Sequence, residues 1–220
     1  MAAAFIEIAQ SCAPVIEVQT LAGVISLESG FQPFAIRTNS GKPLAAQPTS
    51  KAEAIELATS LVADHQDVQI GLGAISVEEL RKLKLSISEA FEPCLNLRAT
   101  ATLLDGYYRL ALRGGATAAQ AETVMLQSYY GRNDPSLGAT VRYDEQVRQE
   151  MKKLAPKLDA LVLAEPHEQA RSIDRSHSHV ARPLTKPLSP ATEAASWDVY
   201  GSRRRSSVLV FNNNQPEQSE

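Results

Sequence analysis

The chain has 220 residues, of which 22 are basic and 25 acidic, so its formal net charge is only -3. This balance gives no strong field of either sign, so neither a nucleic acid nor an anionic membrane surface is predicted as a partner. Hydrophobic residues make up 44% of the chain, but no run of about 18 apolar residues occurs, and no membrane-spanning helix is predicted. The length suits one ordinary domain with an appendage.

The N-terminal segment, residues 1–13, is mildly apolar. It carries Glu7 in place of a basic region ahead of a continuous apolar run, so it predicts no secretory signal peptide. The two cysteines, Cys12 and Cys94, form neither a CxxC motif nor a Cys/His ligand spacing, and no zinc site is predicted. From the residues alone, one disulfide bridge and two free thiols both remain open.

Helix starts are marked by capping boxes, in which a Ser or Thr is followed three residues later by Glu or Gln. The four pairs are Ser50 with Glu53, Ser76 with Glu79, Ser86 with Glu89, and Thr117 with Gln120. Apolar residues at helical spacing predict two further helices, over 15–25 and 95–107. Segments 29–41 and 67–73 are rich in Gly, Pro and polar residues. They predict loops or short extended pieces, so any sheet is small.

A last helix is predicted over 141–164, where apolar residues recur every three or four positions. From Pro166 onward the composition changes, with five of the twelve prolines and three of the four histidines. We therefore predict a folded domain over 1–165 and a disordered tail over 166–220. The His177 and His179 pair lacks carboxylate or Cys neighbours and favours a solvated tail over a metal site. No metal site is predicted.

The most informative segment follows the 15–25 stripe and reads Leu27-Glu28-Ser29-Gly30-Phe31, then Gln-Pro-Phe-Ala-Ile. It resembles the Glu-Ser motif of soluble lytic transglycosylases of the lysozyme-like superfamily, in which an acid ends a core helix. The resemblance places Glu28 as the catalytic acid and Ser29 beside the substrate. A carboxyl that emerges from an apolar helix into a cleft is partly desolvated, and desolvation raises its pKa toward the value that a general acid needs. The competing interpretation is an ordinary exposed glutamate at a helix end.

The resemblance also implies a mechanism that needs one carboxylate, whereas most glycosidases use two. The 6-hydroxyl of the muramic acid sugar attacks its own anomeric carbon. Glu28 first donates a proton to the leaving oxygen and then accepts one from that hydroxyl. The product carries a 1,6-anhydro ring, and no cofactor is implied.

A second match is the segment Gly71-Leu72-Gly73-Ala74-Ile75-Ser76. It is similar to the Gly-Leu-x-Gln-Ile-Asn loop that lines the saccharide groove in this family, so the residues 71–73 are expected to bind substrate. Ala74 stands where the family has glutamine, and Ser76 where it often has asparagine. The loop has therefore lost a side-chain amide that could bind a sugar. The alternative is that the two glycines only make a turn.

A third match links the two cysteines. The segment Pro93-Cys94-Leu95-Asn96-Leu97 resembles the start of the helix after the groove, in particular in the VirB-type branch of the family. That branch also has a Cys-Ala-Pro near its beginning, as Cys12-Ala13-Pro14 does here. The resemblance implies a disulfide between Cys12 and Cys94 that ties the first helix to the fourth. Two buried thiols are the alternative.

A fourth match lies at Tyr129 and Tyr130, which occupy the place of the family's Ala-Tyr-Asn near the acid. Tyr129 matches the tyrosine, and Tyr130 replaces the asparagine. Both are expected to contact substrate. The Tyr129 hydroxyl could position Glu28 by a hydrogen bond. The alternative is ordinary packing, in which the ring is buried and the hydroxyl stays exposed to water.

Together these matches predict a mainly α, lysozyme-like fold (α+β) with a substrate groove and a disordered C-terminal tail. The implied function is a periplasmic lytic transglycosylase that cuts the β-1,4 bond between N-acetylmuramic acid and N-acetylglucosamine in peptidoglycan. It would open the wall for a type IV secretion system, with glycan strands and secretion subunits as partners, the latter through the tail. One alternative is a weakly active or inactive wall-binding assembly factor, because of Ala74 and Tyr130. Another is an unrelated helical adaptor.

Overall fold

The computed structural model describes residues 4–39 and 44–163 of the chain. The domain boundary expected at 165, the tail over 166–220 and the histidine pair within it lie outside these residues. Nothing in the described part tests those expectations.

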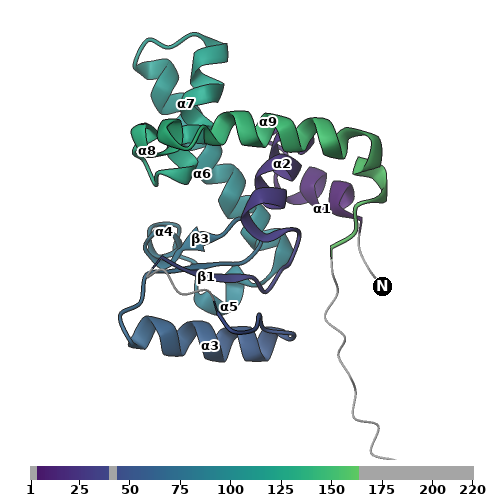
Figure 1. Cartoon of the computed structure of the whole chain (residues 1–220), viewed down its shortest axis with the longest axis vertical. Helices are drawn as coiled ribbons and strands as arrows, with labels where there is room; N and C mark the ends of the chain where they lie inside the picture. The colour runs from purple at the N-terminus through teal and green to yellow at the C-terminus, as the bar shows by residue number, and fades with distance from the viewer. Residues whose placement is uncertain (1–3, 40–43, 164–220) are drawn as a thin grey trace, which may run out of the picture. The chain divides into compact units, whose positions relative to one another are not determined.

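The described part is mainly helical with one small sheet, which confirms the expected fold class (Figure 1). The helices are α1 (Phe5–Cys12), α2 (Val18–Ser29), α3 (Lys51–Ala63), α4 (Val77–Lys82), α5 (Ile87–Ala90), α6 (Pro93–Arg113), α7 (Ala118–Tyr130), α8 (Pro135–Thr140), α9 (Tyr143–Leu154) and the 3-10 helix η1 (Ala155–Ala160). The strands are β1 (Ile36–Thr38), β2 (Val68–Ile70) and β3 (Ile75–Ser76).

The sheet is antiparallel with the strand order β1-β2-β3. The strands β1 and β2 lie in the two segments that were predicted to be loops or short extended pieces, and β3 lies just after the second of them. Arg37 in β1 pairs with Gln69 in β2. Val68 and Ile70 on either side of Gln69 are buried. Because side chains alternate along a strand, Gln69 points to the opposite face of the sheet from these two, and Arg37 shares that face.

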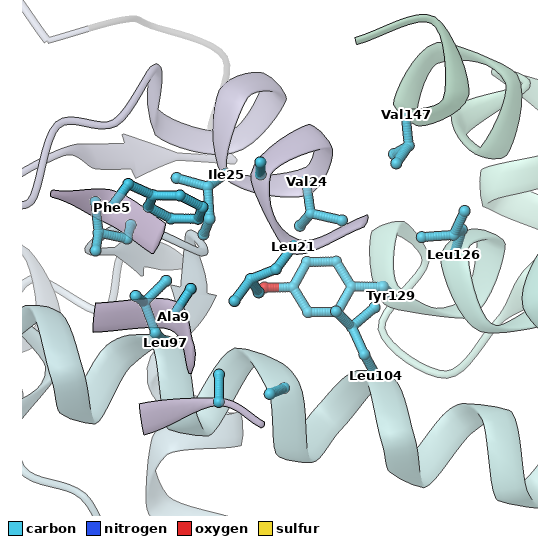
Figure 2. Close-up of a cluster of buried hydrophobic side chains, with 14 of the residues drawn as sticks. Phe5, Ala9, Leu21, Val24, Ile25, Leu97, Leu104, Leu126, Tyr129 and Val147 are labelled. Atoms are coloured by element: carbon cyan, nitrogen blue, oxygen red, sulfur yellow. The ribbon is translucent and has the colours of Figure 1, made fainter. Parts of the chain in front are cut away.

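Two hydrophobic clusters form the core, and α6 contributes to both. Leu97 and Leu104 of α6 belong to the first cluster, which gathers side chains from α1, α2, α7 and α9. Ala99 belongs to the second, which lies under the sheet and the short helices. Figure 2 labels the following members of the first cluster: Phe5, Ala9, Leu21, Val24, Ile25, Leu97, Leu104, Leu126, Tyr129 and Val147. The helix α6 therefore joins the helical part of the fold to the sheet.

The start of the chain differs from the sequence expectation. Residues 5–12 form α1, which was not predicted, and Phe5 and Ala9 are fully or almost fully buried. The next helix begins at Val18, so Val15, which was assigned to its apolar stripe, is 58% exposed. The stripe predicted over 95–107 is also only partly correct, because Ala99 is buried while its other expected members, Leu95, Leu103 and Tyr107, are only partly buried.

The last predicted helix, 141–164, is divided into shorter pieces. Arg142 takes a left-handed conformation with φ 53° and separates α8 from α9. At the other end, Pro156 lies in η1, where its missing N–H and fixed φ disrupt the regular α-helical pattern. The expected apolar stripe does face the core, with Val147 fully buried.

The packing of α9 along α2 depends on Gly23 (Figure 1). A Cβ added at Gly23 would lie 2.9 Å from Met151 Cγ and 3.0 Å from Val147 Cγ1. The close approach brings the start of α9, at Tyr143, to the end of α2, at Glu28 and Ser29.

The structure contains the expected disulfide between Cys12 and Cys94. Cys12 is the last residue of α1 and Cys94 lies in the first turn of α6. The bridge therefore fixes α1 to the helix that the two hydrophobic clusters share.

Candidate active site

Glu28 lies in the last turn of α2 and is 7% exposed. The helix ends directly after it because Gly30 adopts a left-handed conformation (φ 58°) and its N–H donates to the carbonyls of Ile25 and Ser26. The carboxyl group is thus held at the end of a helix, where the buried apolar residues of α2 meet a groove.

The groove beside Glu28 has a volume of about 610 Å³. It is lined by residues from α2, the sheet and its connections, α4, and the region from α7 to α8. The lining residues are Glu28, Ile36, Arg37, Thr38, Asn39, Leu44, Gln47, Gln69, Ala74, Glu79, Tyr129, Tyr130, Gly131, Arg132 and Leu137. An open cavity of this size suits a chain-like or small-molecule ligand.

Two side chains hold the Glu28 carboxyl from different elements. The Tyr143 hydroxyl, at the start of α9, donates to Glu28 Oε1 at 2.5 Å. Arg37 in β1 donates from Nη1 to Glu28 Oε2 at 2.9 Å, and from Nη2 to the Leu27 carbonyl at 2.6 Å. Both carboxyl oxygens are therefore fixed.

The pKa of Glu28 is raised above its ordinary value, chiefly because burial disfavours the charged form. The hydrogen bond from Tyr143 and the charge of Arg37 act in the opposite direction and lower it, but burial is the larger effect. Burial, followed by the nearby Glu28 charge, raises the pKa of Tyr143 well above its ordinary value. Tyr143 therefore remains a donor, and Glu28 keeps a proton to a higher pH than an exposed glutamate does.

Tyr129 does not donate to Glu28. Its ring is buried in the first cluster, and its hydroxyl donates to the Gly73 carbonyl at 2.6 Å. The contact considered for Tyr129 is made instead by Tyr143, which the sequence motifs did not single out. Tyr130 is 46% exposed on the groove, and its ring lies against that of Tyr143 with centroids 5.1 Å apart.

The loop of residues 71–73 supports the groove from behind. Asn96 of α6 accepts from the Gly73 N–H at 2.8 Å, and its own amide donates to the carbonyls of Ala90 and Ile70 at 2.8 and 3.3 Å. A Cβ added at Gly73 would lie 2.0 Å from the Thr100 hydroxyl oxygen. Position 73 therefore needs glycine because the loop packs closely on α6. The glycine thus does more than allow a turn.

Four residues expected at the substrate do not line the groove. Gly71, Leu72 and Gly73 are buried, and Leu72 belongs to the first hydrophobic cluster. The Ser29 hydroxyl turns back along its helix and donates to the Ile25 carbonyl at 3.2 Å. Of the residues expected at the substrate, Tyr129 and Tyr130 line the groove. Ala74, which was expected only as the position of a lost amide, also lines it and directly follows residues 71–73.

The groove has a second carboxylate, that of Glu79, but it is already engaged. Glu79 Oε2 accepts from the Ser76 hydroxyl and backbone N–H as part of the capping box of α4. Glu28 lines the same groove, and burial raises its pKa. The arrangement can therefore supply one general acid that becomes a general base after it gives up its proton.

The described residues hold no cluster of three or more His, Cys, Asp or Glu side chains that could bind a metal ion. Within the same residues, no helix is long and apolar enough to cross a membrane.

Comparison with known proteins finds relatives of one kind. The type IV secretion system protein virB1 of Brucella suis is 38% identical over 108 residues, which are 49% of this chain and 45% of that protein. The same protein of Brucella abortus gives the same values. Protein virB1 of Agrobacterium fabrum is 27% identical over 208 residues, 93% of this chain and 74% of that protein.

The matched region thus spans less than half the length of the Brucella relatives. No protein-family model matches the chain, and no solved structure matches it.

Proposed function

We infer that this chain, a homologue of the VirB1 proteins of type IV secretion systems, is a peptidoglycan lytic transglycosylase that forms 1,6-anhydro-N-acetylmuramic acid ends. The observation that carries the proposal is the buried Glu28 carboxyl at a groove of about 610 Å³, with both oxygens held and its pKa raised. This is the protonation behaviour that a general acid requires.

In the first step, protonated Glu28 gives its proton to the glycosidic oxygen as the bond between that oxygen and C1 of N-acetylmuramic acid breaks. The leaving N-acetylglucosamine gains a free 4-hydroxyl. Tyr143 and Arg37 donate to the resulting carboxylate and stabilise the charge that appears on it.

In the second step, the 6-hydroxyl of the same N-acetylmuramic acid attacks C1, and its proton passes to the Glu28 carboxylate. The acid is restored, the anhydro ring closes, and no water is consumed. Because the attacking hydroxyl belongs to the substrate, its high effective concentration replaces activation by a second carboxylate. The engagement of Glu79 in a capping box supports this one-acid mechanism.

The proposed role of the reaction is local opening of the cell wall during assembly of a type IV secretion system, in the periplasm. Peptidoglycan strands and secretion-system subunits are the partners. The tail over 166–220, where we place the contact with those subunits, lies outside the described residues.

The test is mass spectrometry of fragments that the oxidised protein releases from purified peptidoglycan, with Glu28→Gln as the variant. The glutamine can keep both contacts, because its oxygen accepts from Arg37 and its amide donates to the tyrosine oxygen. We expect anhydro ends from the parent and a loss of about 100-fold or more in the variant. Glu56→Gln, on an exposed position of α3, is the matched control and should be fully active.

Equal release of anhydro ends by Glu28→Gln and by the parent would overturn the assignment of the acid. If neither protein cuts but both bind peptidoglycan, the wall-binding assembly factor is the correct function. The alanine at position 74, where the family resemblance implies a glutamine, would then explain the lost activity.

A further inference from the structure

Three side-chain amides line the groove, and two of them are occupied. Gln47 accepts from the Ile36 N–H and donates to the Ile36 carbonyl, both at 2.9 Å, so it acts as one more partner for the edge of β1. Asn39 donates to Asp67 Oδ2 at 2.7 Å. Within residues 4–39 and 44–163, the amide of Gln69 has no hydrogen-bond partner.

Gln69 is placed to meet a ligand near the acid. It is the middle residue of β2, half-buried between Val68 and Ile70, whose side chains lie on the core face. Its partner across the sheet is Arg37, which shares its face and contacts Glu28. Its side-chain amide lines the groove, where its donors and its acceptor are available to a ligand.

The neighbouring loop lacks a polar group. Ala74 lines the groove with a methyl group, at a position where the resemblance to lytic transglycosylases implies a glutamine. Ala74 immediately precedes β3, whose Ser76 pairs with Gln69 across the sheet. Gln69 in the sheet and Ala74 just before β3 thus line the same groove.

We propose that Gln69 binds the glycan and supplies the side-chain amide that is absent at position 74. This proposal rests on the proposed function. A carboxamide offers two donors and one acceptor, which match the carbonyl and N–H of a sugar's N-acetyl group. Gln69 is therefore a substrate-binding residue that selects N-acetylated sugars beside Glu28.

The experiment measures binding in the Glu28→Gln background, so that the glycan stays intact. The probe is a tetrasaccharide of alternating N-acetylglucosamine and N-acetylmuramic acid, with a de-N-acetylated form for comparison. Gln69→Ala should weaken binding of the acetylated form about 3- to 10-fold and leave the de-N-acetylated form almost unchanged. Gln19→Ala, on an exposed position of α2, is the matched control and should change neither.

A second variant asks whether the two positions share one role. Adding Ala74→Gln to Gln69→Ala should restore most of the lost affinity for the glycan. Ala74→Gln alone, with Gln69 in place, should increase the affinity by a smaller factor. Thermal unfolding is measured for each variant to test for a structural cause. The unfolding temperature should match that of the parent background, because Gln69 lies outside both hydrophobic clusters.

The outcomes separate this inference from the proposed function. If the Glu28→Gln protein binds the tetrasaccharide and Gln69→Ala binds it equally well, the role of Gln69 is wrong and the proposed function stands. Equal weakening for both forms of the sugar would overturn the N-acetyl selectivity. If the Glu28→Gln protein binds neither form, both proposals fail.

Discussion

The two walls of the groove differ in how their polar groups are used. The helical wall consists of Glu28, Tyr129 and Tyr130, backed by Tyr143, and the sheet wall consists of Arg37, Gln69 and Ala74. In the helical wall, the Glu28 and Tyr143 groups satisfy each other, and Arg37 reaches across to complete the set. In the sheet wall, the side-chain amide of Gln69 has no hydrogen-bond partner among the described residues. This difference fits the roles that we propose for Glu28 and Gln69, because an acid needs a fixed position and a tuned pKa, whereas a binding group must be left available.

The walls are also held by different forces. Packing of α9 on α2 sets the helical wall, and it joins residues 115 positions apart. The sheet wall is set by side-chain amides, with Gln47 on the edge of β1 and Asn96 behind the loop of residues 71–73. Both walls depend on α6, which the disulfide ties to α1. Variants can therefore weaken both walls together or either one alone.

The largest effect is expected from removing the disulfide, which weakens both walls. The double variant Cys12→Ser with Cys94→Ser opens a loop that spans 82 positions. Constraint of the unfolded chain by a loop of this length is worth about 4 kcal/mol in free energy of unfolding. Urea unfolding should show this loss, and the reduced parent should unfold like the variant. Equal stability of the oxidised parent and the variant would contradict the prediction.

Asn96→Ala should weaken the sheet wall alone. The change leaves the buried Gly73 N–H and the Ala90 carbonyl without their partner, which costs about 2 to 3 kcal/mol in free energy of unfolding. Glycan binding should fall while the pH dependence of cleavage stays in place. Asn39→Ala, at an exposed asparagine, provides the control for stability. Urea unfolding that is the same for Asn96→Ala and the parent would count against the supporting role.

Tyr143→Phe should weaken the helical wall alone. The ring and its packing remain, but Glu28 loses the donor at 2.5 Å. Losing one hydrogen bond to a charged group costs about 1.5 kcal/mol, or roughly tenfold in the rate of cleavage, with the fold unchanged. Tyr108→Phe, at a half-buried position of α6 that does not line the groove, is the control and should keep full activity. Full activity of Tyr143→Phe would show that the hydroxyl does not hold the acid.

The smallest effect is expected where the walls meet, at Arg37. Its positive charge lowers the pKa of Glu28, so Arg37→Ala should raise that pKa further above its ordinary value. Because the acid must be protonated, the alkaline limb of kcat/KM should move to higher pH. The Arg37 side chain is 47% exposed, so water and salt weaken its influence. The alkaline limb of Arg37→Lys should lie between those of the parent and Arg37→Ala. An alkaline limb that does not move in Arg37→Ala would contradict this electrostatic role.

Local sequence signals predicted much of the framework. All four Ser or Thr residues of the capping boxes start a helix, and three of the boxes form in full at Ser76, Ser86 and Thr117. Ser50 accepts from the Glu53 N–H, but the Glu53 side chain turns to Thr49 instead. These contacts span three or four residues, so the sequence alone determines them.

Motif resemblance predicted the part of the site that is continuous in sequence. It placed Glu28 at the end of a core helix and paired Cys12 with Cys94, and the structure has both features. It did not find α1, because the apolar residues of that short helix form no long stripe and are buried only by contacts with distant segments.

Only the tertiary structure decided which groups meet in the groove. Glu28 is held by Tyr143 and not by Tyr129, because packing of α9 on α2 brings the first hydroxyl to the acid, while the second is used by Gly73. The strand register places Gln69 beside Arg37. A sequence lists donors and acceptors, but their pairing depends on distances between segments far apart in the chain, which are fixed when the helices and strands pack.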